Sequence, residues 1–283
     1  MGGDDSLCLD EPQDGSTSTH LWGTWELWCD LAQNNPHHGA ADAPSRTNPS
    51  TVSGSWLNQI KHIGIFDNAE AFWGLCNCLL LPSQLPGNTT YFLFRSHIMP
   101  MWEHEANRRG GKWIVTFSHP PSHVPAAGKD EAKDMKATDR MLPVDVAWQR
   151  LCLAAIGELF PCEEVEICGV TVNRVKARVG GGGTSYAEWK VCVWTRMASE
   201  EATQMAIAQF IKELLVGNTI TDHGNAPVAS NTPVSCQEGG EKGGVARMTL
   251  NFMPHRELME AKQCHAQGGA RAPIIKPKYT LDL

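Results

Sequence analysis

The chain has 283 residues, which is enough for one domain with a substantial hydrophobic core. Hydrophobic residues make up 42% and charged residues 19%, which excludes an intrinsically disordered protein, and no apolar run is long enough for a transmembrane helix. The net charge of −7 arises in residues 1–45, which hold eight acidic residues and no Lys or Arg. The balanced remainder excludes a long non-specific basic surface but still allows a polyanionic partner.

The N-terminal region predicts a tail followed by strands. Residues 1–18 are acidic and rich in turn-forming types, so we expect a flexible tail ahead of a single domain over 19–283. A strand is predicted over about 20–30, then a polar insert at about 34–54, and a second strand through Ile60–Ile63.

A helix is predicted over about 68–80. Asp67 followed by Glu70 three residues later fits a capping box with an acidic N-cap. Leu81-Pro82 is expected to end this helix. Four of its side chains could face a core, namely Phe72, Leu75, Cys76 and Leu79.

A strand at Tyr91–Phe94 precedes a glycine-containing turn. Asn107–Gly111 predicts a hairpin turn, because only glycine takes a positive φ without cost, and it should return the chain along Lys112–Phe117. Residues 118–141 are rich in Pro, Ala, Lys and Asp and read as an exposed insert.

The second half adds helices and strands in alternation. The predicted elements are a helix at 144–159, strands at 166–179 and 188–196, a helix at 199–216, a polar insert at 218–246 and a strand at 247–253. The fold class is therefore α+β, a curved, mainly antiparallel sheet with helices on one face.

Tryptophan is unusually abundant, with ten residues against eight Phe and three Tyr. Trp22, Trp25, Trp28 and Trp113 lie in predicted strands and are expected to pack structurally. Trp56 and Trp102 instead accompany loop signals, where large rings are useful when a ligand stacks on them.

The order of these landmarks resembles the eukaryotic translation initiation factor 4E family, which binds the messenger-RNA 5′ cap. The resemblance covers about residues 19–256 and implies an eight-stranded curved sheet with three long helices on its convex face. It is carried by Trp25-x-x-Trp28, Trp56, Phe72-Trp73, Pro100-Met101-Trp102-Glu103-x-Glu105-x-Asn107, Gly110-Gly111-x-Trp113, Ile156-Gly157-Glu158 and Val191-Cys-Val-Trp194-Thr195.

The resemblance implies a site for a cationic base. Trp56 and Trp102 would sandwich the 7-methylguanine, and Trp194 would lie against its methyl group. Methylation adds a cation–π contribution of about 2 kcal/mol when desolvated. Glu103 would accept hydrogen bonds from the guanine N1–H and N2 amino group.

The resemblance also implies basic contacts to the triphosphate. Apolar residues change parity between Val172 and Val175, which predicts a β-bulge at Asn173–Arg174 and puts Lys176 and Arg178 in the family's two basic positions. Arg174 would share or flank their face. Two further phosphate contacts are Lys190 and, indirectly, Lys112.

A partner surface is expected on the first helix. Trp73 resembles the exposed tryptophan that docks a Tyr-x-x-x-x-Leu-apolar helix of scaffold and repressor proteins. Ala69, Gln149 and Leu153 complete the predicted surface. Gln149 stands where the family prefers an apolar residue, which weakens or retunes docking; packing of Trp73 alone is the alternative.

Other classes of function remain as alternatives. We expect no enzyme, cofactor or metal site, because His119 and His123 flank two prolines and no nucleophile, P-loop or dinucleotide motif occurs. The alternatives are a cap-binding repressor or mRNA-fate factor, and an aromatic-cage reader of methylated lysine. We expect a monomer in the cytoplasm, with the nucleus open as a second compartment.

The termini and cysteines give little more. We expect no secretory signal, because the first residues hold neither a basic region nor an apolar stretch, and we expect the ten cysteines, which form no Cys-x-x-Cys pair, to be reduced. Met1-Gly2-x-x-x-Ser6 matches a myristoylation pattern with Cys8 nearby, although Asp4 and Asp5 oppose anionic lipid.

Overall fold

The computed structural model describes residues 18–31, 60–119, 141–163, 165–179, 185–216, 249–266 and 275–283. The predicted tail and three polar inserts lie outside these ranges, apart from a few end residues. Trp56 also lies outside them.

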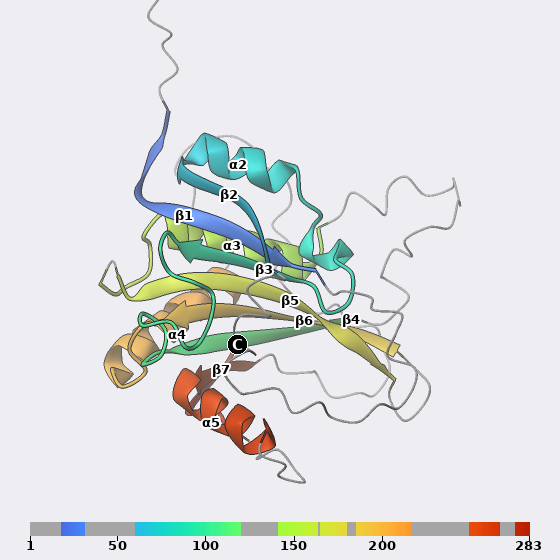
Figure 1. Ribbon diagram of the computed structural model, residues 1–283, viewed down its shortest axis with the longest axis vertical. Helices are drawn as coiled ribbons and strands as arrows, with labels where there is room; N and C mark the ends of the chain where they lie inside the picture. Colours follow the sequence, from blue (N-terminus) through green and yellow to red (C-terminus); the bar gives the residue numbers. More distant parts are fainter. Residues whose placement is uncertain are drawn as a thin grey trace, which may run out of the picture.

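Within these ranges, eight strands form one sheet in which every strand pairing is antiparallel (Figure 1). The strand order is β2-β1-β3-β5-β6-β4-β7-β8. The strands are β1 (His20–Asp30), β2 (Ile60–Asn68), β3 (Thr90–Arg95), β4 (Gly111–His119), β5 (Ile167–Val179), β6 (Ser185–Thr195), β7 (Thr249–Pro254) and β8 (Tyr279–Asp282). The predicted α+β class with an eight-stranded sheet is confirmed.

Three helices cover the convex face of the sheet: α2 (Ala69–Asn77), α3 (Pro143–Ile156) and α4 (Glu201–Val216). A 3₁₀ turn, η2 (Pro82–Gln84), follows α2, and a fourth helix, α5 (His255–Ala266), follows β7 (Figure 1). The sequence did not predict α5. Among the described helices none is both long and apolar enough to cross a membrane.

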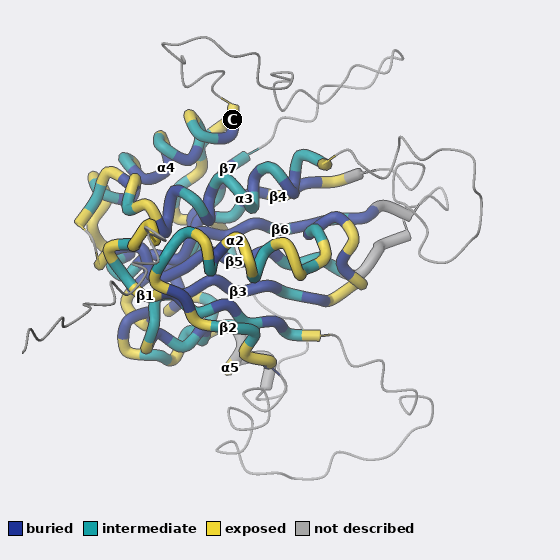
Figure 2. Tube along the Cα trace, turned by 90° about the horizontal axis from the view of Figure 1, so that it is seen from above, coloured by how far each residue is buried: buried dark blue, intermediate teal, exposed yellow. Residues whose placement is uncertain are grey.

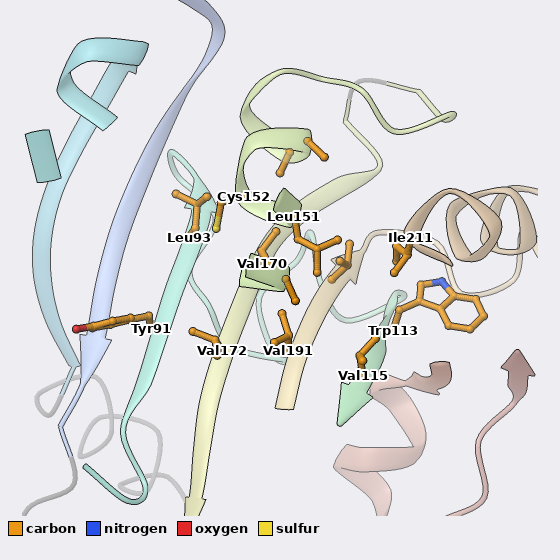
Figure 3. Packing of buried hydrophobic residues seen from close by; sticks show 14 of the residues in the cluster. Tyr91, Leu93, Trp113, Val115, Leu151, Cys152, Val170, Val172, Val191 and Ile211 are labelled. Carbon is orange, nitrogen blue, oxygen red and sulfur yellow. The ribbon is translucent and has the colours of Figure 1, made fainter. Parts of the chain in front are cut away.

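The main core lies between the sheet and these helices. Valines of β4, β5 and β6 meet Leu151 and Cys152 of α3, and Ile211 of α4 lies near Trp113 (Figure 3). Buried residues follow the central strands β3, β5 and β6 (Figure 2). Four consecutive residues of β3, Tyr91 to Phe94, are buried. A strand covered on both faces carries such a continuous apolar run, so the opposite face also holds a hydrophobic cluster.

Two local predictions need correction. The N-cap of α2 is Asn68, whose side chain accepts the Ala71 amide, while Glu70 accepts from the amide of Thr19; no Asp67–Glu70 capping box forms. The Glu70 carboxylate is bonded to Thr19, which is distant in sequence, and a local sequence pattern cannot reveal such a partner.

The turn before β4 is not a hairpin turn. Strands β3 and β4 are separated in the sheet by β5 and β6. Gly110 is required for a different reason than the expected positive φ: a Cβ there would lie 1.8 Å from the Thr195 carbonyl oxygen. Close approach of two backbones therefore selects the glycine.

Candidate functional site

An aromatic cluster occupies the concave face, opposite α2, α3 and α4. We call it the concave cluster; its buried members are Phe92, Phe94, Ile98, Ala106, Cys168, Cys192 and Trp194, with Trp28, Trp102 and Ile114 partly buried beside them. Side chains of a strand alternate between faces. Thus Phe92 and Phe94 face this cluster, whereas Leu93 belongs to the main core.

Trp102 lies in the loop between β3 and β4, residues 96–110, which we call the Trp102 loop. Hydrogen bonds fix the backbone of this loop. Asn107 is fully buried, and its Nδ2 donates to the carbonyl oxygens of Met99 at 2.9 Å and Met101 at 2.8 Å. The amide of Asn107 also donates to the His104 carbonyl at 2.9 Å. These bonds fix the backbone on both sides of Trp102. The neighbouring Glu103 is exposed on the same turn.

The side chain of Lys112 lies against two of the predicted site tryptophans, Trp102 and Trp194. Its ammonium lies 5.6 Å from the ring centroid of Trp102 and 5.5 Å from that of Trp194. Both distances fall within cation–π range. The structure therefore brings together Trp102, Trp194 and Lys112, with the Lys112 ammonium at the indole faces.

Trp194 is 4% exposed and forms the floor of the concave cluster. Its ring packs edge-on against Phe94 with centroids 5.3 Å apart, and at a tilt of 49° against His255 with centroids 4.4 Å apart. Its Nε1–H has no hydrogen-bond partner within the described part of the chain. Buried polar atoms without partners are rare in folded proteins and often accompany function.

His255 is a site residue that the sequence reasoning missed. It is fully buried at the start of α5, and its Nδ1 lies 2.7 Å from the carbonyl oxygen of Asn107. Burial lowers the pKa of His255 to about 4, with a smaller contribution from the charge of Lys112. Only its position directly after a strand could have drawn attention to it.

The structure places the basic residues of β5 and β6 differently from one another. Lys190 shares the face of Cys192 and Trp194 by alternation along β6; its side chain is 45% exposed and lies 3.6 Å from Glu188. Lys176 and Arg178 lie on β5, where only their backbone is described.

The predicted positions of Arg174 and of the bulge are wrong. Pairing of β5 with β6 is regular from Gly169 through Val175, with one register shift before it, between Ile167 and Gly169, and another after it, between Val175 and Arg178. Arg174 consequently stays on the face of Val172, where its guanidinium donates to the Leu85 carbonyl and lies over the Trp189 ring. It faces the helix side of the sheet and is not part of the concave site.

The predicted partner surface lies on the opposite side of the molecule. Phe72 is buried, whereas Trp73 is 37% exposed and packs edge-on against it at 5.2 Å. Ala69, Gln149 and Leu153 are all partly accessible. A Cβ on Gly74 would meet nothing within 4 Å, so the surface beside Trp73 is open.

The fold and the concave cluster together define a class: single-domain proteins whose open antiparallel sheet is covered by helices on one face and bears an aromatic cluster on the other. Residues 20–223 match the family model for eukaryotic initiation factor 4E. This match covers well over half of the chain, which therefore belongs to the eukaryotic initiation factor 4E family.

Curated relatives agree with this family. Eukaryotic translation initiation factor 4E of Dictyostelium discoideum is 29% identical over 197 residues, which cover 69% of this chain and 59% of that protein. The isoform 4E of Arachis hypogaea is 31% identical over 191 residues, covering 68% of this chain and 71% of that protein. The chain thus spans less than two thirds of the Dictyostelium relative.

Solved structures share the fold. One is Ascaris suum eIF4E-3 in complex with m2,2,7G cap, with a TM-score of 0.54, 22% identity, and coverage of 93% of this chain and 98% of that one. Another is C. elegans eIF4E-3 with the 4E-binding protein Mextli, with a TM-score of 0.53, 23% identity, and coverage of 94% and 100%.

Proposed function

We propose that this chain binds the 7-methylguanosine 5′ cap of messenger RNA on its concave face. The observation that carries the proposal is that a single cation, the Lys112 ammonium, lies over the ring faces of both Trp102 and Trp194. Indoles so placed suit the delocalised positive charge of a 7-methylated purine. Family membership supports this choice, as does the Ascaris neighbour solved with a methylated cap.

The base has three recognition elements in this proposal. Trp102 and Trp56 stack on its two faces, which contributes about 1–3 kcal/mol per ring regardless of methylation. Trp194 contacts the methyl group, so the cation–π contribution distinguishes the methylated base. The exposed carboxylate of Glu103 accepts from N1–H and the N2 amino group.

The triphosphate is held by the side of the site formed by β5, β6 and β4. Lys190, whose side chain is 45% exposed, lies on the face of Trp194, and Lys176 and Arg178 follow along β5. Lys112 completes this set. Arg174 is excluded, because its guanidinium is bonded to Leu85 on the helix side.

Retention on immobilised 7-methyl-GTP tests the proposal. The parent should be retained and should be eluted by free 7-methyl-GTP but not by GTP. Trp102→Ala and Trp56→Ala should both lose retention. Trp22→Ala is the matched control, because Trp22 is 88% exposed and lies outside the concave cluster. Parent-like retention of both site variants would place the binding site elsewhere.

We further propose that Trp73 docks a partner helix carrying Tyr-x-x-x-x-Leu-apolar, which links the cap to the translation machinery in the cytoplasm. An exposed indole on a helix face supports this, as does the neighbour solved with Mextli. Titration with such a peptide should give binding that Trp73→Ala weakens and Trp22→Ala leaves unchanged. Binding to repressor but not scaffold peptides would instead favour the cap-binding repressor.

A methyl-lysine reader is the second candidate, because the two indoles already hold an alkylammonium, that of Lys112. Such a reader has no use for the basic residues beyond the cage. Lys190→Ala and Lys176→Ala should leave a reader unaffected, whereas in a cap binder they should weaken binding and reduce its salt dependence.

A further inference from the structure

His255 contacts both sides of the proposed cap site. Its ring packs on the indole of Trp194 with centroids 4.4 Å apart. Its backbone amide donates to the Gly110 carbonyl at 2.9 Å, which fixes the start of α5 against the end of the Trp102 loop. The residue is fully buried, so its ring has little freedom to move away from Trp194.

The imidazole donates a hydrogen bond to the Trp102 loop. Its Nδ1 lies 2.7 Å from the Asn107 carbonyl oxygen, and a carbonyl oxygen can only accept. The proton of the neutral ring is therefore on Nδ1. Nε2 is left as an acceptor and has no hydrogen-bond partner among the described residues.

Asn107 transmits this contact to Trp102. Its side-chain amide donates to the carbonyl oxygens of Met99 and Met101, and Met101 immediately precedes Trp102. A continuous series of contacts thus runs from the Trp194 ring through His255 and Asn107 to the backbone of Trp102.

We propose that His255 is a positioning residue that sets the spacing between Trp102 and Trp194. Stacking and cation–π interactions need their rings held to within about half an ångström, and this is provided by neighbours whose own side chains are fixed. The inference rests on the proposed cap-binding function, in which His255 acts through the two indoles without touching the ligand.

Two variants separate the roles of the ring and of the donor. His255→Phe keeps a ring against Trp194 but removes the imidazole donor from the Asn107 carbonyl, which then accepts only from the Gly110 amide. Its affinity for 7-methyl-GTP should fall about tenfold, the equivalent of one buried hydrogen bond. His255→Asn places an amide donor at the same distance along the side chain as Nδ1. It should restore affinity to within about threefold of the parent.

Hydrogen exchange in the free protein provides a second measurement that needs no ligand. The amides of His104, Asn107 and Gly110 donate within the turns of the Trp102 loop. They should exchange faster in His255→Phe and near the parent rate in His255→Asn. Should His255→Phe fail to fold, His255→Gln, whose amide is one bond further out, takes its place with the same expectation.

A matched core variant controls for a general loss of stability. Ile207→Ala truncates a fully buried side chain of α4 in the main core, on the other side of the sheet from the concave cluster. It should lower the melting temperature without changing the affinity for 7-methyl-GTP or the exchange of the loop amides. The inference is wrong if His255→Phe binds and exchanges like the parent, or if Ile207→Ala reproduces its effects. If the parent does not bind 7-methyl-GTP, the proposed function fails, and hydrogen exchange alone then decides the role of His255.

Discussion

At the scale of single residues, the ammonium of Lys112 determines what the concave site presents to a ligand. It lies at cation–π distance from both Trp102 and Trp194. A methylated purine brings its own positive charge to the same ring faces, so the two cations compete for them. The phosphates of the same ligand, however, attract Lys112. One residue therefore opposes binding of the base and favours binding of the triphosphate.

Replacing Lys112 with methionine should separate these effects. Lys112→Met should bind the nucleoside 7-methylguanosine about 2–5 times more tightly, because a competing cation–π contact of roughly 0.5–1 kcal/mol is removed. The same variant should bind 7-methyl-GTP more weakly than the parent. Calorimetry with both ligands measures this difference. Arg108→Met is the control, because Arg108 is an exposed basic residue in the Trp102 loop, just before β4. Equal weakening for both ligands would contradict the competition.

The helix-side position of Arg174 gives a second prediction. Arg174→Ala should lower the free energy of unfolding by about 1–3 kcal/mol, because the Leu85 carbonyl loses its donor and Trp189 loses a covering group. It should leave 7-methyl-GTP affinity and its salt dependence unchanged. Lys190→Ala should do the reverse, with little effect on stability and a shallower salt slope. Denaturation and salt titrations of both variants provide the measurements.

At the scale of elements, the sequence predicted those whose periodicity is set by burial. The strands β1 and β3 were predicted correctly, since each packs on the main core. The expectation that Trp22 of β1 packs structurally is wrong, because Trp22 is 88% exposed. The helix α5 and the strand β8 were missed. Among the side chains of α5 that the structure describes, only His255 at its start is buried, and β8 depends on pairing with β7. Neither has a strong local pattern, because long-range contacts hold both.

The bulge of β5 shows the same limit. A change in parity indicates that an extra residue exists, but the parity pattern left its exact position open. The regular register through Val175 moves the shift past Arg174, and this reverses the face assigned to that side chain. The hydrogen bond from Arg174 to the Leu85 carbonyl is a long-range contact, which a local parity pattern does not contain.

Two glycines provide a matched test of element-level packing. Gly110→Ala should destabilise the fold severely, by more than about 3 kcal/mol, because its Cβ would overlap the Thr195 carbonyl and separate β4 from β6. Gly74→Ala, within α2, meets open space and should stabilise by about 0.5–1 kcal/mol. Thermal or urea unfolding of both variants measures the difference. A well-folded Gly110→Ala protein of parent stability would contradict the close approach of the two strands.

At the scale of the whole molecule, the sheet buries apolar residues on both faces but uses them differently. The convex face is sealed by three helices, and two of its buried indoles are bonded: Trp113 Nε1 donates to Gln204 at 3.0 Å and Trp189 Nε1 to the Pro82 carbonyl at 2.8 Å, while Trp25 Nε1 has no partner among the described residues. On the concave face, Trp28, Trp194 and His255 each keep a buried nitrogen without a partner in the described ranges. The resemblance identified Trp102 and Trp194 by their motifs. It gave no indication of His255, because this residue reaches Trp194 and Asn107 only through long-range contacts at the start of α5.

This arrangement makes stability depend on pH through one buried imidazole. The pKa of His255 is lowered to about 4 in the folded protein, against 6.5 for an unperturbed histidine, mainly because burial disfavours the charged ring. Lys112 on β4 is the charged neighbour that adds to this effect, while the hydrogen bond with the Asn107 carbonyl opposes it. Between these two pKa values the unfolded chain binds a proton that the folded chain does not. The free energy of unfolding should therefore fall as pH is lowered through this window.

The expected loss from His255 is about 3 kcal/mol between pH 6.5 and 4, and none of it arises above pH 7. Chemical denaturation of the parent and of His255→Asn across this range isolates the contribution, because the other titrating groups are common to both proteins. The parent should lose more stability than His255→Asn as pH falls, and the two curves should run parallel above pH 7. Parallel curves over the whole range would mean that His255 is protonated as easily in the folded protein as in the unfolded chain, which is incompatible with a buried neutral ring on Trp194.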